Sequence, residues 1–259
     1  MASFEGEKFC YANTTHEFFL LTNIFILFYE TSFRLHLHTF IKIVVGFNFF
    51  LMSLFEDIDF VENPLYERII ADLTKQQFSV IDDFFSDEET NLLRQSLLER
   101  YAVDGFKKAA VGNRLNQTIV NSIRGDFILW IDEANTNVIE TCFFNKIDSM
   151  VGYLNKTCFL GIAHKEFHYA IYPEGTFYKK HIDSFQNDDR RKLSFVCYLN
   201  EANWLPENGG ELVLYLKNKE QHIYPLPGRV VVFESHVIEH EVKPVFTERL
   251  SITGWLKTH

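Results

Sequence analysis

Apolar residues recur at helical spacing in two segments of the chain. Ser86 followed by Glu89 matches a capping box. The leucines that follow share one helical face: Leu92, Leu93, Leu97 and Leu98. This pattern predicts a helix that ends near Tyr101, and a second apolar stripe predicts a helix over Val138 to Leu154. Both stripes are typical of helices that pack against a core.

Short apolar runs dominate the chain after Lys165, and turn residues such as Pro173 with Gly175 separate them. The runs that predict strands are Phe167 to Tyr172, Leu193 to Leu199, Glu211 to Leu216, Arg229 to Phe233 and Leu250 to Leu256. Many short strands at this spacing predict a sandwich or barrel. We therefore expect an α+β, mainly β fold, with a double-stranded β-helix (jelly roll) core that N-terminal helices brace.

A polar stretch without clear periodicity runs from Asp104 to Asn121, before an apolar strand expected over Ile123 to Ile131. We predict a long loop that feeds this strand and acts as a mobile lid over a substrate. Its cations would suit an acidic target: Lys107, Lys108 and Arg114. The alternative interpretation is an ordinary solvated loop.

The first 51 residues differ in composition from the rest. They are crowded with Phe, Ile, Leu and Asn, and their only basic residues are Lys8, Arg34 and Lys42. Neither apolar stretch is long enough to span a bilayer, and no basic start or cleavage site marks a secretory signal. We predict that residues 1–51 are an extension outside the native fold and that residues 52–259 form one domain. A membrane anchor is the alternative.

Charge and cysteine content narrow the function classes. The 259-residue chain is 47% hydrophobic and carries a formal net charge of −10. It can bury a core, but it lacks the Lys and Arg excess that nonspecific nucleic-acid binding uses. Its cysteines show neither metal-ligand spacing nor a dense disulfide pattern: Cys10, Cys142, Cys158 and Cys197. We expect a cytoplasmic protein without a nucleic-acid or membrane partner.

Candidate metal ligands lie in the strand-rich part. His181 and Asp183 are two residues apart, so within one strand they would project to the same face and bind one ion together. His240 follows the strand predicted at Arg229 to Phe233, in a stretch that a jelly roll folds back beside the earlier hairpin. Two imidazoles and one carboxylate on one side of Fe(II) leave positions open for O₂ and a chelating cosubstrate.

Arg249 makes this set more specific than its members are alone. It lies nine residues after His240, with Ser251 on the same face of the last predicted strand. An Arg fork suits a carboxylate that is bound bidentately, although a solvated charge at a strand edge is the alternative. His236 is the weaker ligand candidate because it lacks this spacing to Arg249. The remaining histidines are expected at the surface or in the core: His164, His168 and His222.

The pattern His181-x-Asp183, His240-Glu241-Val242 and Arg249-x-Ser251 resembles the 2-oxoglutarate/Fe(II)-dependent prolyl 4-hydroxylase family. The resemblance covers roughly Phe78 to the C-terminus and is closest to bacterial relatives of the hypoxia-inducible-factor prolyl hydroxylases. Further segments carry it: Ser122 to Asp126 with Trp130, Tyr172-Pro173, Asp188 to Arg191, Tyr198 to Glu201, Gly209-Gly210 and Arg249 to Trp255.

This resemblance implies a role for each matching residue. The ligands of Fe(II) would be His181, Asp183 and His240. Arg249 would bind the distal carboxylate of 2-oxoglutarate, Tyr198 would add a hydrogen bond to it and Tyr172 would line the pocket. Aromatic core is the alternative for both tyrosines. O₂ and ascorbate complete the implied cofactor set. At the site entrance, Asp126 would form a charged pair with Arg191 or Arg190.

The resemblance also implies a substrate, a protein with a proline on an exposed loop. In the bacterial relatives the known target is elongation factor Tu. Rival functions stay open. A nucleic-acid oxygenase of the same fold would carry a second Arg six residues after the first, where this chain has Trp255. A small-molecule oxygenase would share the ligands, whereas a non-catalytic metal-binding jelly-roll module would need no Arg249.

Overall fold

The computed structural model describes residues 61–103, 105–109, 122–184, 190–201 and 203–259. Within these ranges, Glu62–His259 forms one compact unit. The predicted extension of residues 1–51 lies outside the described residues. So does most of the lid predicted from Asp104 to Asn121. Both stay predictions.

The elements of the described part follow one another from helices to strands. The helices are α3 (Pro64–Gln76), α4 (Asp87–Ala102) and α5 (Val138–Cys158). The strands are β1 (Phe78–Ile81), β2 (Lys107–Lys108), β3 (Phe127–Trp130), β4 (His164–Tyr172), β5 (Tyr178–His181), β6 (Arg191–Tyr198), β7 (Leu212–Leu216), β8 (Lys219–Ile223), β9 (Val230–Glu234), β10 (Glu239–Val242) and β11 (Arg249–Lys257). None of the described helices has the length and apolar character that a membrane crossing requires.

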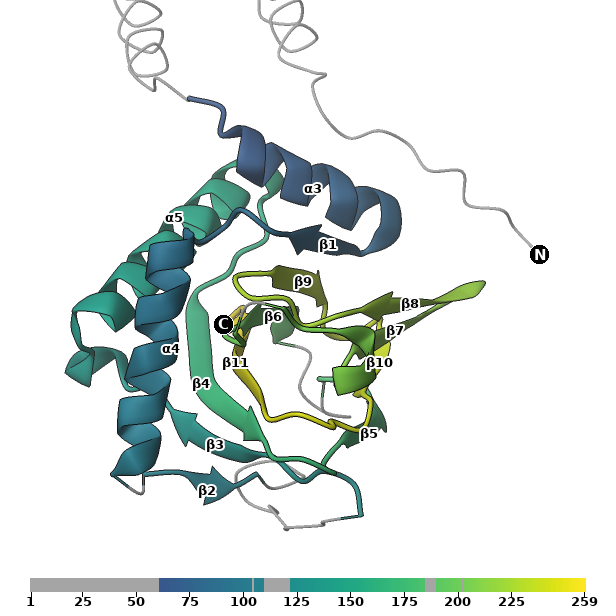
Figure 1. Ribbon diagram of the computed structural model, residues 1–259. Helices are drawn as coiled ribbons and strands as arrows, with labels where there is room; N and C mark the ends of the chain where they lie inside the picture. Colours follow the sequence, from purple (N-terminus) through teal and green to yellow (C-terminus); the bar gives the residue numbers. More distant parts are fainter. Residues whose placement is uncertain (1–60, 104, 110–121, 185–189, 202) are drawn as a thin grey trace, which may run out of the picture. The chain divides into compact units, whose positions relative to one another are not determined.

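Two antiparallel sheets carry the fold. The large sheet has seven strands in the order β1-β9-β6-β11-β4-β3-β2, and the small sheet has four in the order β5-β10-β7-β8. From β4 onward the chain passes back and forth between the two sheets, which is the winding of a jelly roll (Figure 1). The predicted mainly β jelly roll with bracing helices is therefore confirmed.

The helices α4 and α5 run along one face of the large sheet (Figure 1). Capping boxes start both helices, with Ser86 and Glu89 on α4 and with Asn137 and Glu140 on α5. The first of these boxes confirms the predicted helix start. The core beneath the helices takes alternate residues of the strands, such as Phe167, Tyr169 and Ile171 of β4.

The residues of β4 that alternate with Phe167, Tyr169 and Ile171 turn to the opposite face of the large sheet, towards the small sheet. There the core contains Val196, Tyr198 and Phe233 of the large sheet with Leu212 and Leu214 of the small sheet. Strands of the large sheet are thus covered on both faces. This explains why their sequences read as continuous apolar runs.

A buried carboxylate joins both helices to the large sheet. Glu140 of α5 is 1% exposed and accepts hydrogen bonds from Arg100 at 2.6 and 2.5 Å, from Ser96 at 3.1 Å and from Tyr169 at 3.0 Å. Burial opposes ionisation of this carboxyl, but the bonds from Arg100 outweigh it and hold the pKa of Glu140 below its ordinary value. This cluster fixes α4, α5 and β4 together.

The structure corrects several element predictions. The periodicity misses α3 and β1, and it misses β8 and β10 because charged residues interrupt their apolar pattern. The second helix continues past Leu154 to Cys158, where Phe159 takes the left-handed conformation. The stretch predicted as a loop contains β2, which pairs with β3, and the strand expected over Ile123 to Ile131 is limited to Phe127–Trp130.

Candidate active site

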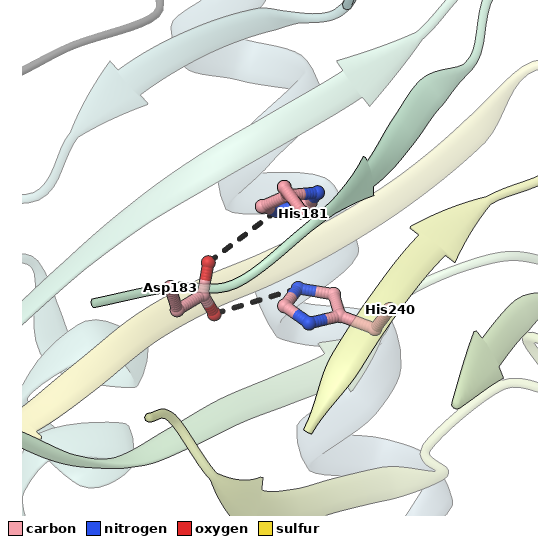
Figure 2. A group of neighbouring side chains, drawn as sticks. All are labelled: His181, Asp183 and His240. Carbon is pink, nitrogen blue, oxygen red and sulfur yellow. Dashed lines mark ion pairs between the residues drawn. The ribbon is translucent and has the colours of Figure 1, made fainter. Parts of the chain in front are cut away.

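His181, Asp183 and His240 come together in one cluster, as Figure 2 shows. The carboxylate of Asp183 lies between the two imidazoles, with Oδ1 3.4 Å from His181 Nε2 and Oδ2 3.5 Å from His240 Nε2. One ligand atom from each residue can be chosen so that all lie within 4.8 Å of one another. The set of two imidazoles and one carboxylate suits a divalent transition metal such as Fe(II).

Both strands of one antiparallel pair position the histidines. His240 of β10 lies opposite His181 of β5 in the small sheet. The expectation that His181 and Asp183 share one strand is wrong, because β5 ends at His181. Asp183 lies in the bend that follows, where Ser194 of β6 donates a hydrogen bond of 2.6 Å to its Oδ2. The large sheet therefore orients the carboxylate, and the small sheet holds the imidazoles.

Backbone carbonyls fix the tautomer of both histidines. Nδ1 of His181 lies 2.7 Å from the carbonyl of Lys179, and Nδ1 of His240 lies 3.2 Å from that of Ile238. Because a carbonyl only accepts, each Nδ1 carries the proton and each Nε2 presents its lone pair to the cluster. Burial and neighbouring His181 lower the pKa of His240 to about 4, which keeps it neutral at pH 7.

Asp183 is ionised in the same environment. Burial opposes its negative charge, but His240, His181 and the hydrogen bond from Ser194 outweigh the burial and hold the pKa of Asp183 well below its ordinary value. An ionised carboxylate is the form of Asp183 that binds a metal.

Arg249 lies at the start of β11, directly opposite Tyr172 of β4, and is 2% exposed. Its Cζ atom lies 4.9 Å from the ring centroid of Tyr172 and 4.9 Å from that of Tyr198. Among the described residues, neither Arg249 Nε nor Tyr198 Oη has a hydrogen-bond partner. Buried polar atoms without partners are costly, so this group of three side chains is suited to a polar ligand.

Gly209 and Gly210 allow the chain to pack closely beside Arg249. Both have positive φ, 65° and 69°. A Cβ atom on Gly210 would lie 3.1 Å from Arg249 Cδ, and one on Gly209 would lie 2.2 Å from the carbonyl oxygen of Pro244. The Gly-Gly pair is therefore part of the support of the arginine.

A cavity of about 610 Å³ brings these groups together, and residues of both sheets line it. Its lining includes the three cluster residues, Arg249 and Tyr172, but not Tyr198, which is fully buried beside Arg249. The strand register aligns Trp130, His168 and Thr253 in one row across β3, β4 and β11. This row forms part of the cavity wall.

The predicted pair of Asp126 with Arg191 is corrected, because the two residues take different partners. Asp126 accepts hydrogen bonds of 2.8 and 2.6 Å from Arg124, which lies two residues earlier. Arg191 donates to Glu166 at 2.9 Å and to the carbonyl of Asp183 at 3.0 Å. Its Cζ also lies 3.6 Å from the ring centroid of Trp255. Each arginine thus pairs with a nearby carboxylate of the large sheet.

Comparison with known proteins agrees with this geometry. Residues 167–257 match the model of the 2OG-Fe(II) oxygenase superfamily. The chain is 34% identical to a Pseudomonas putida prolyl-4-hydroxylase of known structure, with 76% of this chain and 100% of that chain covered and a TM-score of 0.69. The chain belongs to the prolyl 4-hydroxylases of the 2OG-Fe(II) oxygenase superfamily.

Animal prolyl hydroxylases are similar as well. One from Trichoplax adhaerens, solved with a peptide fragment of the hypoxia-inducible factor oxygen degradation domain, is 30% identical, with 74% of this chain and 89% of that chain covered and a TM-score of 0.69. The hypoxia-inducible factor prolyl hydroxylase of Caenorhabditis elegans is 29% identical over 201 residues. The match covers 73% of this chain and 28% of that relative's length.

Oxygenases of this superfamily use Fe(II), 2-oxoglutarate and O₂, and ascorbate is typical of them. The described residues of this prolyl 4-hydroxylase fit Fe(II) and 2-oxoglutarate. One ligand atom each of His181, Asp183 and His240 lies within 4.8 Å of the others, close enough to share one ion. The unpartnered Arg249 Nε and Tyr198 Oη fit the carboxylate of an acidic cosubstrate.

Sequence patterns missed several residues of the prolyl 4-hydroxylase site. Tyr178 stacks on His181 with ring centroids 3.7 Å apart, and the guanidinium of Arg124 lies 4.3 Å from the Tyr178 ring centroid. Ser194 holds Asp183, and His168, expected at the surface or in the core, is buried in the cavity wall. The spacing of Tyr178 from His181 gave no signal, whereas Ser194 on an apolar strand was a polar exception.

Proposed function

We propose that this protein is an Fe(II)- and 2-oxoglutarate-dependent dioxygenase that hydroxylates a proline in another protein. One observation carries the proposal. The cluster of His181, Asp183 and His240 lines the same cavity as Arg249, a buried cation whose Nε has no partner among the described residues. A metal site alone would not need such an arginine, whereas a chelating dicarboxylate requires both.

His181, Asp183 and His240 are the proposed ligands of Fe(II). Three ligands on one side leave the other coordination positions for the cosubstrate and O₂. Bound iron and 2-oxoglutarate supply the oxidation of an unactivated carbon, with succinate and CO₂ as co-products. The hydrogen bond from Ser194 Oγ keeps the Asp183 carboxylate oriented, and the hydroxyl of Ser235 lies within hydrogen-bond distance of Ser194 Oγ, at 2.9 Å.

Arg249, Tyr198 and Tyr172 are the proposed binding residues for 2-oxoglutarate. The guanidinium fork suits a carboxylate, and its position over two aromatic rings fixes its plane. Burial raises the pKa of Tyr198, although Arg249 opposes this shift. The phenol therefore keeps its proton and can donate a hydrogen bond to the same carboxylate. Burial also raises the pKa of Tyr172, which stays neutral in the cavity wall.

The substrate that we propose is a proline on an exposed loop of a folded protein. Support comes from the Trichoplax adhaerens relative, which was solved with a peptide of a protein substrate. Elongation factor Tu is the first candidate, because the resemblance is closest to bacterial relatives that act on it. The proposed location is the cytoplasm, which agrees with the free cysteines of the described part: Cys142, Cys158 and Cys197.

The test combines the protein with Fe(II), ascorbate and 2-oxoglutarate, first with a cell lysate and then with elongation factor Tu from the same organism. We expect succinate formation and a mass increase of one oxygen atom on a proline. The Arg249→Ala variant is the control, because a metal-binding module without turnover would not respond to it. Hydroxylation of another protein but not of elongation factor Tu would reject only this target. Oxygen incorporated into nucleic acid or a metabolite, with no prolyl product, would reject the protein substrate.

A further inference from the structure

Among the described residues, the charged groups that line the cavity are mostly positive, whereas the chain as a whole is negative. The whole chain carries −10. The cavity lining contains a single carboxylate, Asp183, and the cations Lys107, Lys108, Arg124, Arg191 and Arg249. Asp126 and Glu166 neutralise two of the arginines, and Arg249 is assigned to the cosubstrate. Lys107 of β2 is then the cavity cation that forms no ion pair with a carboxylate among the described residues.

The strand β2 is an edge strand of the large sheet, and its two lysines leave it on opposite faces. Lys107 lies opposite Ile128, which lines the cavity. Lys108 lies opposite Phe127, with its Nζ 5.9 Å from the Phe127 ring centroid. Residues that lie opposite each other in an antiparallel pair share a face. The ammonium group on the cavity face is therefore that of Lys107.

Exposed apolar side chains line the same cavity as this lysine. Trp130 is 47% exposed and Ile182 is 40% exposed, and both line the cavity. Large apolar groups with this exposure at a cavity are typical of a surface that a partner covers. A polypeptide that enters the cavity thus meets exposed apolar side chains and the positive charge of Lys107 at the β2 edge.

We propose that the substrate segment is acidic and that Lys107 binds an Asp or Glu side chain a few residues from the target proline. This inference rests on the proposed prolyl hydroxylation and names the class of its substrate. In the large sheet, β2 is three strands from β11, so about 14 Å of sheet separates the two strands. An extended chain advances about 3.3 Å per residue, so a segment that runs from the metal cluster to the β2 edge carries the acidic residue several positions from the proline.

The experiment uses a peptide library with one fixed central proline and randomised flanks. The full chain is loaded with Fe(II) and 2-oxoglutarate, and the hydroxylated peptides are sequenced by mass spectrometry. The variants Lys107→Glu and Lys108→Glu differ only in the face of β2 that they change. Lys219→Glu makes the same charge change on β8, in the small sheet and outside the cavity lining. Thermal unfolding confirms that each variant is folded.

We expect Asp and Glu to be enriched at one or two positions of the hydroxylated peptides. Lys107→Glu should reduce kcat/KM for an acidic peptide about 10-fold relative to its Gln counterpart, Lys108→Glu should have a smaller effect and Lys219→Glu none. The acidic preference should also weaken as salt rises. Hydroxylation without acidic enrichment, or enrichment that survives Lys107→Glu, would overturn the inference and leave the proposed function standing. If a lysate protein is hydroxylated but no library peptide is, the inference is overturned and the proposed function stands, whereas no hydroxylation in either would overturn both.

Discussion

The two faces of the large sheet treat buried polar groups in opposite ways. On the helix face, the Glu140 carboxylate is buried and receives hydrogen bonds from Ser96, Arg100 and Tyr169. On the face towards the small sheet, polar atoms are equally buried but have no partner among the described residues: His168 Nδ1, Tyr198 Oη, Arg249 Nε, Ser251 Oγ and Trp255 Nε1. These five residues belong to neighbouring rows of β4, β6 and β11.

One face of the sheet thus has polar groups that stabilise the fold, and the other has polar groups that are suited to binding a ligand. A buried polar group that lacks a partner lowers stability, so it persists where a ligand supplies the partner. On the helix face, the Glu140 carboxylate is satisfied by protein donors, and this network serves the packing of α4 and α5. The unpartnered polar atoms on the cavity face can form hydrogen bonds with a bound molecule. Mutations on the two faces should therefore affect different measurements.

The largest effect is expected at the metal cluster. Asp183→Ala should abolish hydroxylation and weaken iron binding strongly, because it removes one of three ligands, while the fold remains. Iron content and turnover measure the loss, and circular dichroism and thermal unfolding check the fold. His240→Ala should behave in the same way. Wild-type turnover in either variant would remove that residue from the triad.

The next effect concerns cosubstrate binding. Arg249→Ala should raise KM for 2-oxoglutarate, since truncating one partner of a buried charge-assisted contact costs about 2 to 5 kcal/mol. The loss of stability should be smaller than the loss of cosubstrate affinity, because the lost contacts with the Tyr172 and Tyr198 rings are partly offset by removal of an Nε atom that has no hydrogen-bond partner in the described part. Arg68→Ala is the matched control, as Arg68 pairs with Asp83 at the surface. An unchanged KM in Arg249→Ala would exclude this arginine from the cosubstrate site.

On the helix face the effect should fall on stability. Glu140→Gln removes the charge that Arg100 binds and should lower the free energy of unfolding by about 3 kcal/mol. The Arg100 side chain is 34% exposed and keeps access to water, which limits the loss. Chemical denaturation measures this change, and KM for 2-oxoglutarate should stay constant. A shift in KM without loss of stability would contradict the division between the faces.

The sequence predicted those parts of the fold and site that depend on local pattern. The capping box at Ser86 and the apolar runs of β4, β6, β9 and β11 follow from short-range rules, and all lie where expected. The winding brought His240 opposite His181 as the jelly roll implied. The sequence pattern does not predict contacts between residues that are far apart in the chain. Nothing in the spacing indicates that Ser194 reaches Asp183 or that Arg191 pairs with Glu166, because these pairs depend on how distant strands meet.

The last effect is a pH dependence at His168, on the cavity face, which appears only below pH 6.5. Burial first, and then Arg124, lower its pKa to about 4, from an unfolded value of 6.5. Above pH 6.5 the imidazole is neutral in both states, so the stability contribution is fully present. As pH falls from 6.5 towards 4, the unfolded chain takes up a proton that the folded protein does not. Stability should then decrease by up to about 3 kcal/mol.

The variant His168→Leu tests whether protonation of His168 causes this loss of stability at low pH. It also tests the comparison of the two faces of the sheet. It should lose little stability at pH 7, because the Nδ1 atom that it removes has no partner among the described residues. Between pH 6.5 and 4 it should lose less stability than the wild type, since leucine does not titrate. Other histidines contribute equally to both proteins, so the difference between the two denaturation curves isolates His168. Parallel curves over this range would show that His168 is protonated in the folded protein or exposed to water, and its place in a dry cavity wall would be wrong.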